Sequence, residues 1–92
     1  MDGYEWDPAK AATNLEKHKV DFADAALSLQ DPNALTVADP DASDEERFVC
    51  LAADPEGRLL VTVFALNGDT VRIISSRKAS RAERRRYEDD DA

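Results

Sequence analysis

The sequence is poor in the residues that would assign it to several common classes of protein. Of its 92 residues only Cys50 is a cysteine, so no internal disulfide can form, and its place in an apolar run predicts a small core residue. One cysteine and one histidine without ligand spacing predict neither a metal site nor a cofactor. No apolar stretch approaches the length of a membrane span, and the acidic N-terminus is unlike a signal peptide, so we expect a cytosolic protein.

Positive charge is also scarce, since 12 basic residues face 20 acidic ones and the formal net charge is −8. An acidic protein repels phosphate, so this average argues against a nucleic-acid partner. The basic residues are unevenly distributed, however. Residues 72–87 contain seven basic residues and one acidic residue, a net charge of +6, so the remainder of the chain has a net charge of −14. A basic segment on an acidic body predicts an anionic partner, either RNA or an acidic protein segment.

The length predicts a single domain over residues 1–92, and 42% hydrophobic residues argue against disorder. Asp7-Pro8 is typical of a helix start, and apolar spacing predicts helices over residues 8–18 and from Asp21 to a stop at residues 31–33. Residues 4–6 are a candidate short strand. Period-two patterns predict strands over residues 34–38, 47–53, 58–66 and 70–76, of which 58–66 is apolar on both faces and therefore central. This order predicts an α+β fold with an antiparallel sheet of about four strands and both N-terminal helices on one face.

Two local motifs mark the C-terminal part of the chain. Asn67-Gly68 predicts a tight hairpin with a type I′ turn, in which both central residues have positive φ. Ser80 and Glu83 form a capping-box pattern, which predicts a C-terminal helix that begins there and ends at residue 87 or 88. Acids at a helix C-terminus oppose the helix dipole, so residues 89–92 are expected to fray.

Three segments resemble, in order and spacing, the sequence pattern of the BrnT family of toxins. They are Tyr-Glu-Trp-Asp-Pro-Ala-Lys at 4–10 with Asn14, Lys17-His18, Val20 and Phe22; then Glu46-Arg47-Phe48; and finally residues 72–79 followed by Glu83-Arg84 and Tyr87-Glu88. The resemblance implies a RelE-like fold and RNA cleavage without a metal ion. It also implies a ribbon-helix-helix antitoxin, BrnA, with which the toxin represses its own operon, so that DNA is contacted only through the antitoxin.

The chain departs from the family pattern at two places. The pattern has glycine after Lys-His, whereas this chain has Lys19. Members also commonly carry an arginine in the turn before the last strand, whereas residues 65–69 of this chain contain none. If that arginine helps to hold phosphate, its loss predicts a weak nuclease.

Cleavage of RNA by its 2′-hydroxyl needs a group that takes the hydroxyl proton, cations that stabilise the phosphorane-like transition state, and a group that protonates the leaving oxygen. The motif match makes Arg77 the first catalytic candidate, since it lies just before the N-terminus of the C-terminal helix, where free N–H groups also attract anions. The alternative is a surface ion pair with Glu83 or Glu88.

Arg72 is a second catalytic candidate. On a regular strand it shares a face with residues 74 and 76, so we expect these side chains to lie together. There Arg72 either clamps phosphate or is a cross-strand partner of Arg58 or Glu46, and the sequence leaves both roles open.

The first helix supplies three further basic candidates. His18 is a candidate general base or acid, but a structural imidazole that closes the helix on its last carbonyls is the interpretation we favour. Lys17 is expected to act as a cationic catalytic contact. Lys10 lies seven residues earlier, about two turns back on nearly the same face, and is expected to bind RNA.

The basic residues of the C-terminal segment are expected to bind RNA as well. Arg81, Arg84 and Arg85 cluster through i+3 and i+4 spacing, Lys78 precedes them, and Tyr87 is placed to stack on a base. The alternative is a solvated helix face with pairs such as Arg84 and Glu88.

Together these features predict a metal-independent endoribonuclease toxin that inhibits translation and is neutralised by a BrnA-like antitoxin. A second interpretation is a catalytically weak homologue that serves as an antitoxin-binding co-repressor; the missing turn arginine and the net charge of −8 favour it. A gyrase inhibitor on a similar fold is a third interpretation, from which the local motifs point away.

Overall fold

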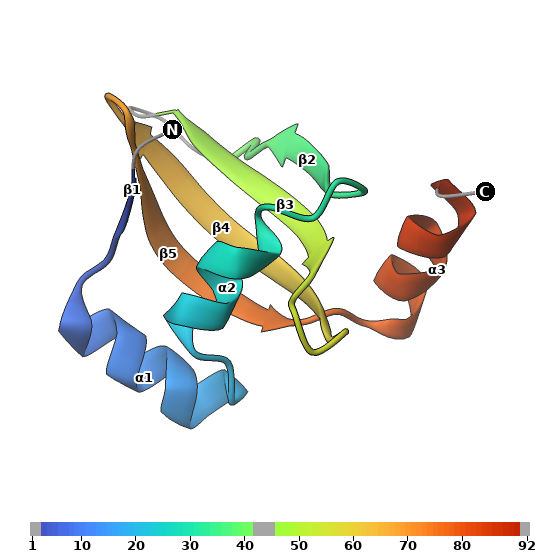
Figure 1. The fold of residues 1–92 in the computed structure, drawn as a ribbon, viewed down its shortest axis with the longest axis horizontal. Helices are drawn as coiled ribbons and strands as arrows, with labels where there is room; N and C mark the ends of the chain where they lie inside the picture. Colours follow the sequence, from blue (N-terminus) through green and yellow to red (C-terminus); the bar gives the residue numbers. More distant parts are fainter. Residues whose placement is uncertain (1–2, 42–45, 91–92) are drawn as a thin grey trace.

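The computed structural model describes residues 3–41 and 46–90. Its strands are β1 (Gly3–Glu5), β2 (Leu35–Ala38), β3 (Arg47–Ala53), β4 (Leu59–Asn67) and β5 (Thr70–Lys78), and its helices are α1 (Pro8–His18), α2 (Phe22–Ser28) and α3 (Arg81–Asp90). The strands form one sheet in the order β1-β5-β4-β3-β2 (Figure 1). None of the helices in these ranges is long and apolar enough to cross a membrane.

The sheet confirms the predicted α+β class and the central place of β4. Strands β3 and β5 flank β4 in antiparallel register, and residues 59–62 of β4 are all buried. Both faces of this strand are therefore covered, as its two-sided apolar pattern predicts. The sheet has one strand more than the expected four, because residues 3–5 add β1 to the far edge of β5 in parallel orientation.

Helices α1 and α2 pack on the same face of the sheet, as predicted (Figure 1). The side chains of Asp7 and Asp21 accept hydrogen bonds from the backbone N–H two residues later, at 2.8 and 2.9 Å, and thereby cap the two helices. Trp6 packs edge-on against Phe22, with 6.1 Å between the ring centroids. The buried cluster on this face consists of Phe22, Ala25, Ala26, Val71 and Ile73.

Helix α3 packs against the opposite face of the sheet through Tyr87. The ring of Tyr87 contacts a small apolar cluster formed by Leu51, Leu59 and Val61. Its hydroxyl donates a hydrogen bond to the carboxylate of Asp31 in the segment after α2. One aromatic side chain thus joins α3 both to the sheet and to the segment that connects α2 to β2.

The start of α3 is the predicted capping box, and its end lies further along than predicted. Ser80 N–H donates to Glu83 Oε1 at 2.7 Å, and Glu83 N–H donates to Ser80 Oγ at 3.2 Å. The helix continues to Asp90, so residues 89 and 90 are helical. The rest of the tail that was expected to fray, residues 91–92, lies outside the described residues.

The predicted hairpin joins β4 and β5, but the predicted turn type is wrong. Asn67 pairs with Thr70, so the central residues are Gly68 and Asp69 instead of Asn67 and Gly68. Only Gly68 has positive φ, at 62°, which is the pattern of a type II′ turn with glycine at its first central position. Asn67 prolongs β4 by one residue, and this shift accounts for the difference.

A side chain, and not a strand, closes the edge of β5 beyond β1. Strand β1 pairs with β5 only over residues 70–72. Further along, the buried amide of Asn14 on α1 donates to the carbonyl of Ser76 at 2.9 Å and accepts from the Ser76 N–H at 3.1 Å. The same amide donates to the carbonyl of Val20 at 3.0 Å. Asn14 therefore satisfies the backbone groups that a neighbouring strand would satisfy, and it fixes α1 against β5.

Helix α1 ends at a residue in the left-handed conformation. Lys19 has φ 61° and ψ 29°, and its N–H donates to the carbonyl of Leu15 at 2.9 Å. This is the position after Lys-His at which the BrnT pattern has glycine, and glycine adopts this conformation without a steric penalty from Cβ. The departure seen in the sequence therefore falls on a position that favours glycine.

We expect Asn14→Ala to lower the free energy of unfolding by about 2–4 kcal/mol, because it leaves buried backbone groups of Ser76 and Val20 without their partner. Urea unfolding followed by circular dichroism measures this change. Thr13→Ala alters the exposed neighbour on the same helix and is the control, for which we expect little effect. Equal stability of Asn14→Ala and wild type would contradict the proposed clamp.

Candidate functional site

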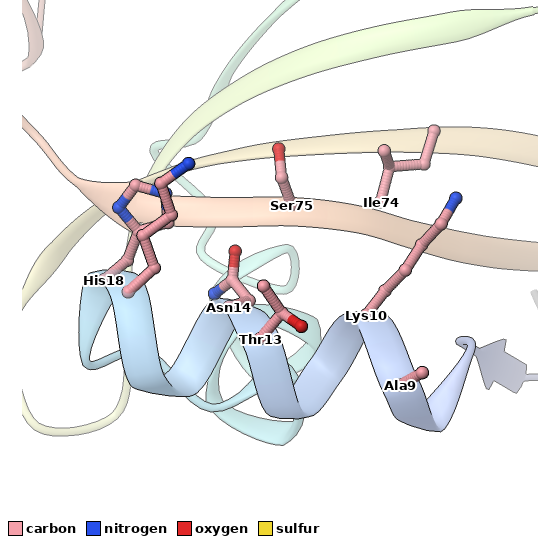
Figure 2. Close-up of a pocket in the computed structure, with 8 residues that line it drawn as sticks. Ala9, Lys10, Thr13, Asn14, His18, Ile74 and Ser75 are labelled. Atoms are coloured by element: carbon pink, nitrogen blue, oxygen red, sulfur yellow. The ribbon is translucent and has the colours of Figure 1, made fainter.

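A groove of about 350 Å³ lies between α1 and β5 (Figure 2). Among the described residues, its lining includes Asn14, Ser75 and three basic side chains, Lys10, Lys17 and His18, but no carboxylate. In Figure 2 the side chain of Lys10 extends from α1 toward β5, while His18 lies at the C-terminal end of the helix. The groove thus combines a cationic wall from the helix with a hydroxyl from the strand.

The spacing of the two lysines on α1 suits an extended anion. Seven residues separate Lys10 from Lys17, which corresponds to about 10 Å along the helix on nearly the same face. Among the residues that the structure describes, the side chains of Lys10, Lys17 and His18 take part in no hydrogen bond or ion pair. The sequence analysis favoured a structural His18 that closes α1 by a hydrogen bond to its last carbonyls. That hydrogen bond is absent among the described residues.

A second groove, of about 430 Å³, opens on the sheet face next to the first. Its lining consists of Val49, Val61, Val63, Asp39, Asp41, His18, Ser75, Ser76 and Arg77. Two residues, His18 and Ser75, line both grooves. The structure therefore brings Lys10, Lys17, His18 and Arg77 together around the C-terminal half of β5, although they come from opposite ends of the sequence.

The guanidinium of Arg77 makes a bidentate ion pair with Glu83. Nη1 donates to Oε1 at 2.8 Å and Nη2 donates to Oε2 at 2.9 Å, and Nη1 also donates to the carbonyl of Lys78 at 3.3 Å. This pair is one of the alternatives that the sequence left open. The hydrogen bonds from Arg77, with help from Ser80, lower the pKa of Glu83 to about 2, so its carboxylate is ionised at neutral pH.

A bulge in β5 changes which residues share a face of the sheet. Ile73 and Ser75 pair with consecutive residues of β4, so Ile74 is an extra residue in the strand. An inserted residue reverses the alternation of side chains that follow it. The expectation that Arg72 and Ser76 lie on one face is therefore wrong, because the two side chains lie on opposite faces.

Arg72 lies away from both grooves, although the bulge places it on the same face as Arg77. In the sheet register it lies opposite Ala65 and Glu5, and not opposite Arg58, whose side chain pairs with Asp54. The register partners of Arg72 and Arg77 on β4, Ala65 and Val61, are four positions apart, which corresponds to about 13 Å. The structure does not bring these two predicted catalytic arginines together.

The remaining basic residues of the C-terminal segment line neither groove. Lys78, Arg81, Arg84 and Arg85 are exposed. Tyr87 is half-buried, and its ring and hydroxyl are both engaged in holding α3. In the ranges that the structure describes, no group of three or more His, Cys, Asp or Glu residues is placed to hold a metal ion.

Two residues that shape the site, Asn14 and Ser75, were given no role in the sequence analysis. Asn14 carried a signal, because it lies three residues after Ala11 and four before His18, on the stripe that these residues form along one face of the predicted helix. A polar side chain on such a stripe indicates a buried hydrogen bond. Ser75 carried none, because only the bulge decides which face it occupies.

The low pKa of Glu83 predicts a pH dependence of stability. A carboxylate whose pKa falls from 4.5 to about 2 on folding stabilises the protein above pH 4.5, and this contribution is lost as the pH falls toward 2. The melting temperature of wild type should therefore fall more steeply across this window than that of Glu83→Gln, which keeps the capping box without the charge. If the melting temperatures of the two proteins fall in parallel from pH 7 to pH 2, the result would contradict a stabilising ion pair.

Comparison with known proteins places the chain in a family. The profile of the family described as "Ribonuclease toxin, BrnT, of type II toxin-antitoxin system" matches residues 6–83. No curated protein sequence gives a significant match. A similar solved structure is that of the Brucella abortus ribonuclease toxin BrnT, with a TM-score of 0.65 and 25% identity over 88% of this chain and 100% of the other. Because the profile spans most of its length, the chain belongs to the BrnT family of ribonuclease toxins of type II toxin-antitoxin systems.

Proposed function

We propose that this chain is a metal-independent endoribonuclease that inhibits translation and is neutralised by a BrnA-like ribbon-helix-helix antitoxin. The observation that supports this proposal best is the cationic groove between α1 and β5, which shares His18 and Ser75 with the groove that contains Arg77. The two grooves meet at His18 and Ser75, and together they are lined by four basic residues and by two carboxylates, Asp39 and Asp41. RNA is the substrate class that the family description implies.

The residues of this surface supply the groups that cleavage by the 2′-hydroxyl requires. Imidazole can both accept and donate a proton, and we assign proton transfer to His18, which faces both grooves. We assign to Arg77 and Lys17 the stabilisation of negative charge on the phosphorane-like transition state. Lys10, two helical turns from Lys17, is assigned to a neighbouring phosphate of the RNA backbone.

The charge distribution favours recognition at close range. A net charge of −8 repels RNA at long distance, so affinity has to come from a local basic surface. Phosphate contacts of this kind weaken steeply with salt. The basic surface continues along α3 through four exposed cations, Lys78, Arg81, Arg84 and Arg85. We assign these cations to binding of RNA, which is anionic, or of the antitoxin, which can present carboxylates.

A second function has its own support. The turn between β4 and β5 has no arginine, and the charge of Arg77 is compensated by Glu83. Both features reduce the cations available to a transition state. A chain with these features is suited to act as a co-repressor that binds its antitoxin without cutting RNA.

We expect purified protein to cleave single-stranded RNA in the presence of EDTA, and expression without antitoxin to slow growth. Arg77→Ala should lower the cleavage rate on the order of 100-fold, because it removes a donor from the transition state. Lys10→Ala should chiefly raise KM, because it removes a contact with a phosphate of the RNA backbone. Gel analysis of RNA fragments and the growth rate measure these effects.

The control for this series is Arg86→Ala, which removes an exposed cation of α3 and leaves both grooves intact. Equal losses for Arg77→Ala and Arg86→Ala would show that net charge, and not the grooves, determines activity. Intact RNA and normal growth with wild-type protein that still binds its antitoxin would support the co-repressor function instead.

A further inference from the structure

The ion pair between Arg77 and Glu83 leaves part of the guanidinium available. Arginine has five N–H donors. Three of those on Arg77 are used, two by the carboxylate of Glu83 and one by the carbonyl of Lys78. The two others, on Nε and Nη2, lie along one edge of the guanidinium and engage no acceptor among the described residues. Such an edge matches the spacing of two phosphate oxygens.

Glu83 itself is held rigidly at the start of α3. Its Oε1 accepts from the Ser80 N–H at 2.7 Å as well as from Arg77, and its own N–H donates to Ser80 Oγ. About one turn later, Tyr87 packs against the sheet and its hydroxyl donates a hydrogen bond to Asp31. The carboxylate that holds Arg77 is therefore fixed both by the helix cap and by the packing of the helix.

We propose that Glu83 is a positioning residue that orients Arg77 so that its Nε–Nη2 edge faces a phosphate of the substrate. This inference rests on the proposed function, since it assigns a role in the same site. A guanidinium on an exposed strand end samples many orientations. Most of these orientations do not contact a phosphate whose position is fixed by other residues. Fixing two of its nitrogens on Glu83 removes this freedom before RNA arrives, and thus favours the bound geometry.

The proposal predicts an effect opposite in sign to that of charge alone. Glu83→Gln removes a negative charge beside an arginine, so simple electrostatics predicts tighter binding of RNA. Positioning predicts weaker binding and slower cleavage, because the amide holds the guanidinium less firmly. Glutamine retains the capping box, so the variant is expected to fold. Glu88→Gln makes the same charge change at an exposed position of the same helix and is the matched control.

The experiment measures kcat and KM on a fluorescent single-stranded RNA in EDTA, and the affinity for its 2′-O-methyl analogue, which cannot be cleaved. We expect Glu83→Gln to lower kcat/KM roughly tenfold and to weaken binding of the analogue, whereas Glu88→Gln does neither. In an Arg77→Ala background, Glu83→Gln should have no further effect, because the residue acts through Arg77. Melting temperatures of all variants are recorded alongside.

Wild-type or tighter binding by Glu83→Gln would overturn the proposal, as would an equal loss in the Arg77→Ala background. If wild-type protein cleaves no RNA, the proposed function fails, and binding of the 2′-O-methyl RNA alone then decides the positioning role by the same criteria. If Glu83→Gln does not fold, Arg77→Lys replaces it, since lysine keeps the charge without the fork. A loss of binding in Arg77→Lys supports the proposal, and wild-type binding overturns it.

Discussion

The hydrogen bonds between the Asn14 amide and the Ser76 backbone determine where the site of this protein lies. Strand β1 covers only the first residues of β5, so the remainder of that edge needs another partner. Asn14 provides it from a helix. Because a helix is wider than a strand, its outer side chains stand away from the sheet, and the space between them is the groove that Lys10, Lys17 and His18 line.

The second half of the site depends on the other features of β5. The bulge at Ile74 places Ser75 and Arg77 on the sheet face that α3 partly covers. The strand ends shortly afterwards, and the capping box of α3 brings Glu83 back to Arg77. One strand thereby joins a cationic groove on the helical side to an oriented arginine on the other side, and His18 contributes to both.

Local signals in the sequence predicted much of the fold, but they did not predict how the site is assembled. Asp7-Pro8, the two-sided apolar run of β4 and the capping box at Ser80 each act within a few residues, and each was confirmed. The pairing of β1 was missed because three residues carry no period, and the bulge was missed because no glycine or proline marks it. The meeting of α1 with Arg77 depends on contacts across 62 positions of sequence, which no local pattern encodes.

The central claim is that RNA binds where the two grooves meet at the end of α1. Amide chemical shifts of ¹⁵N-labelled protein, titrated with a 2′-O-methyl RNA at low salt, test it directly. The account predicts that the largest changes occur at Lys17, His18 and residues 75–77, and that they disappear at high salt. Changes confined to the outer surface of α3, or to the neighbourhood of Arg72, would contradict it.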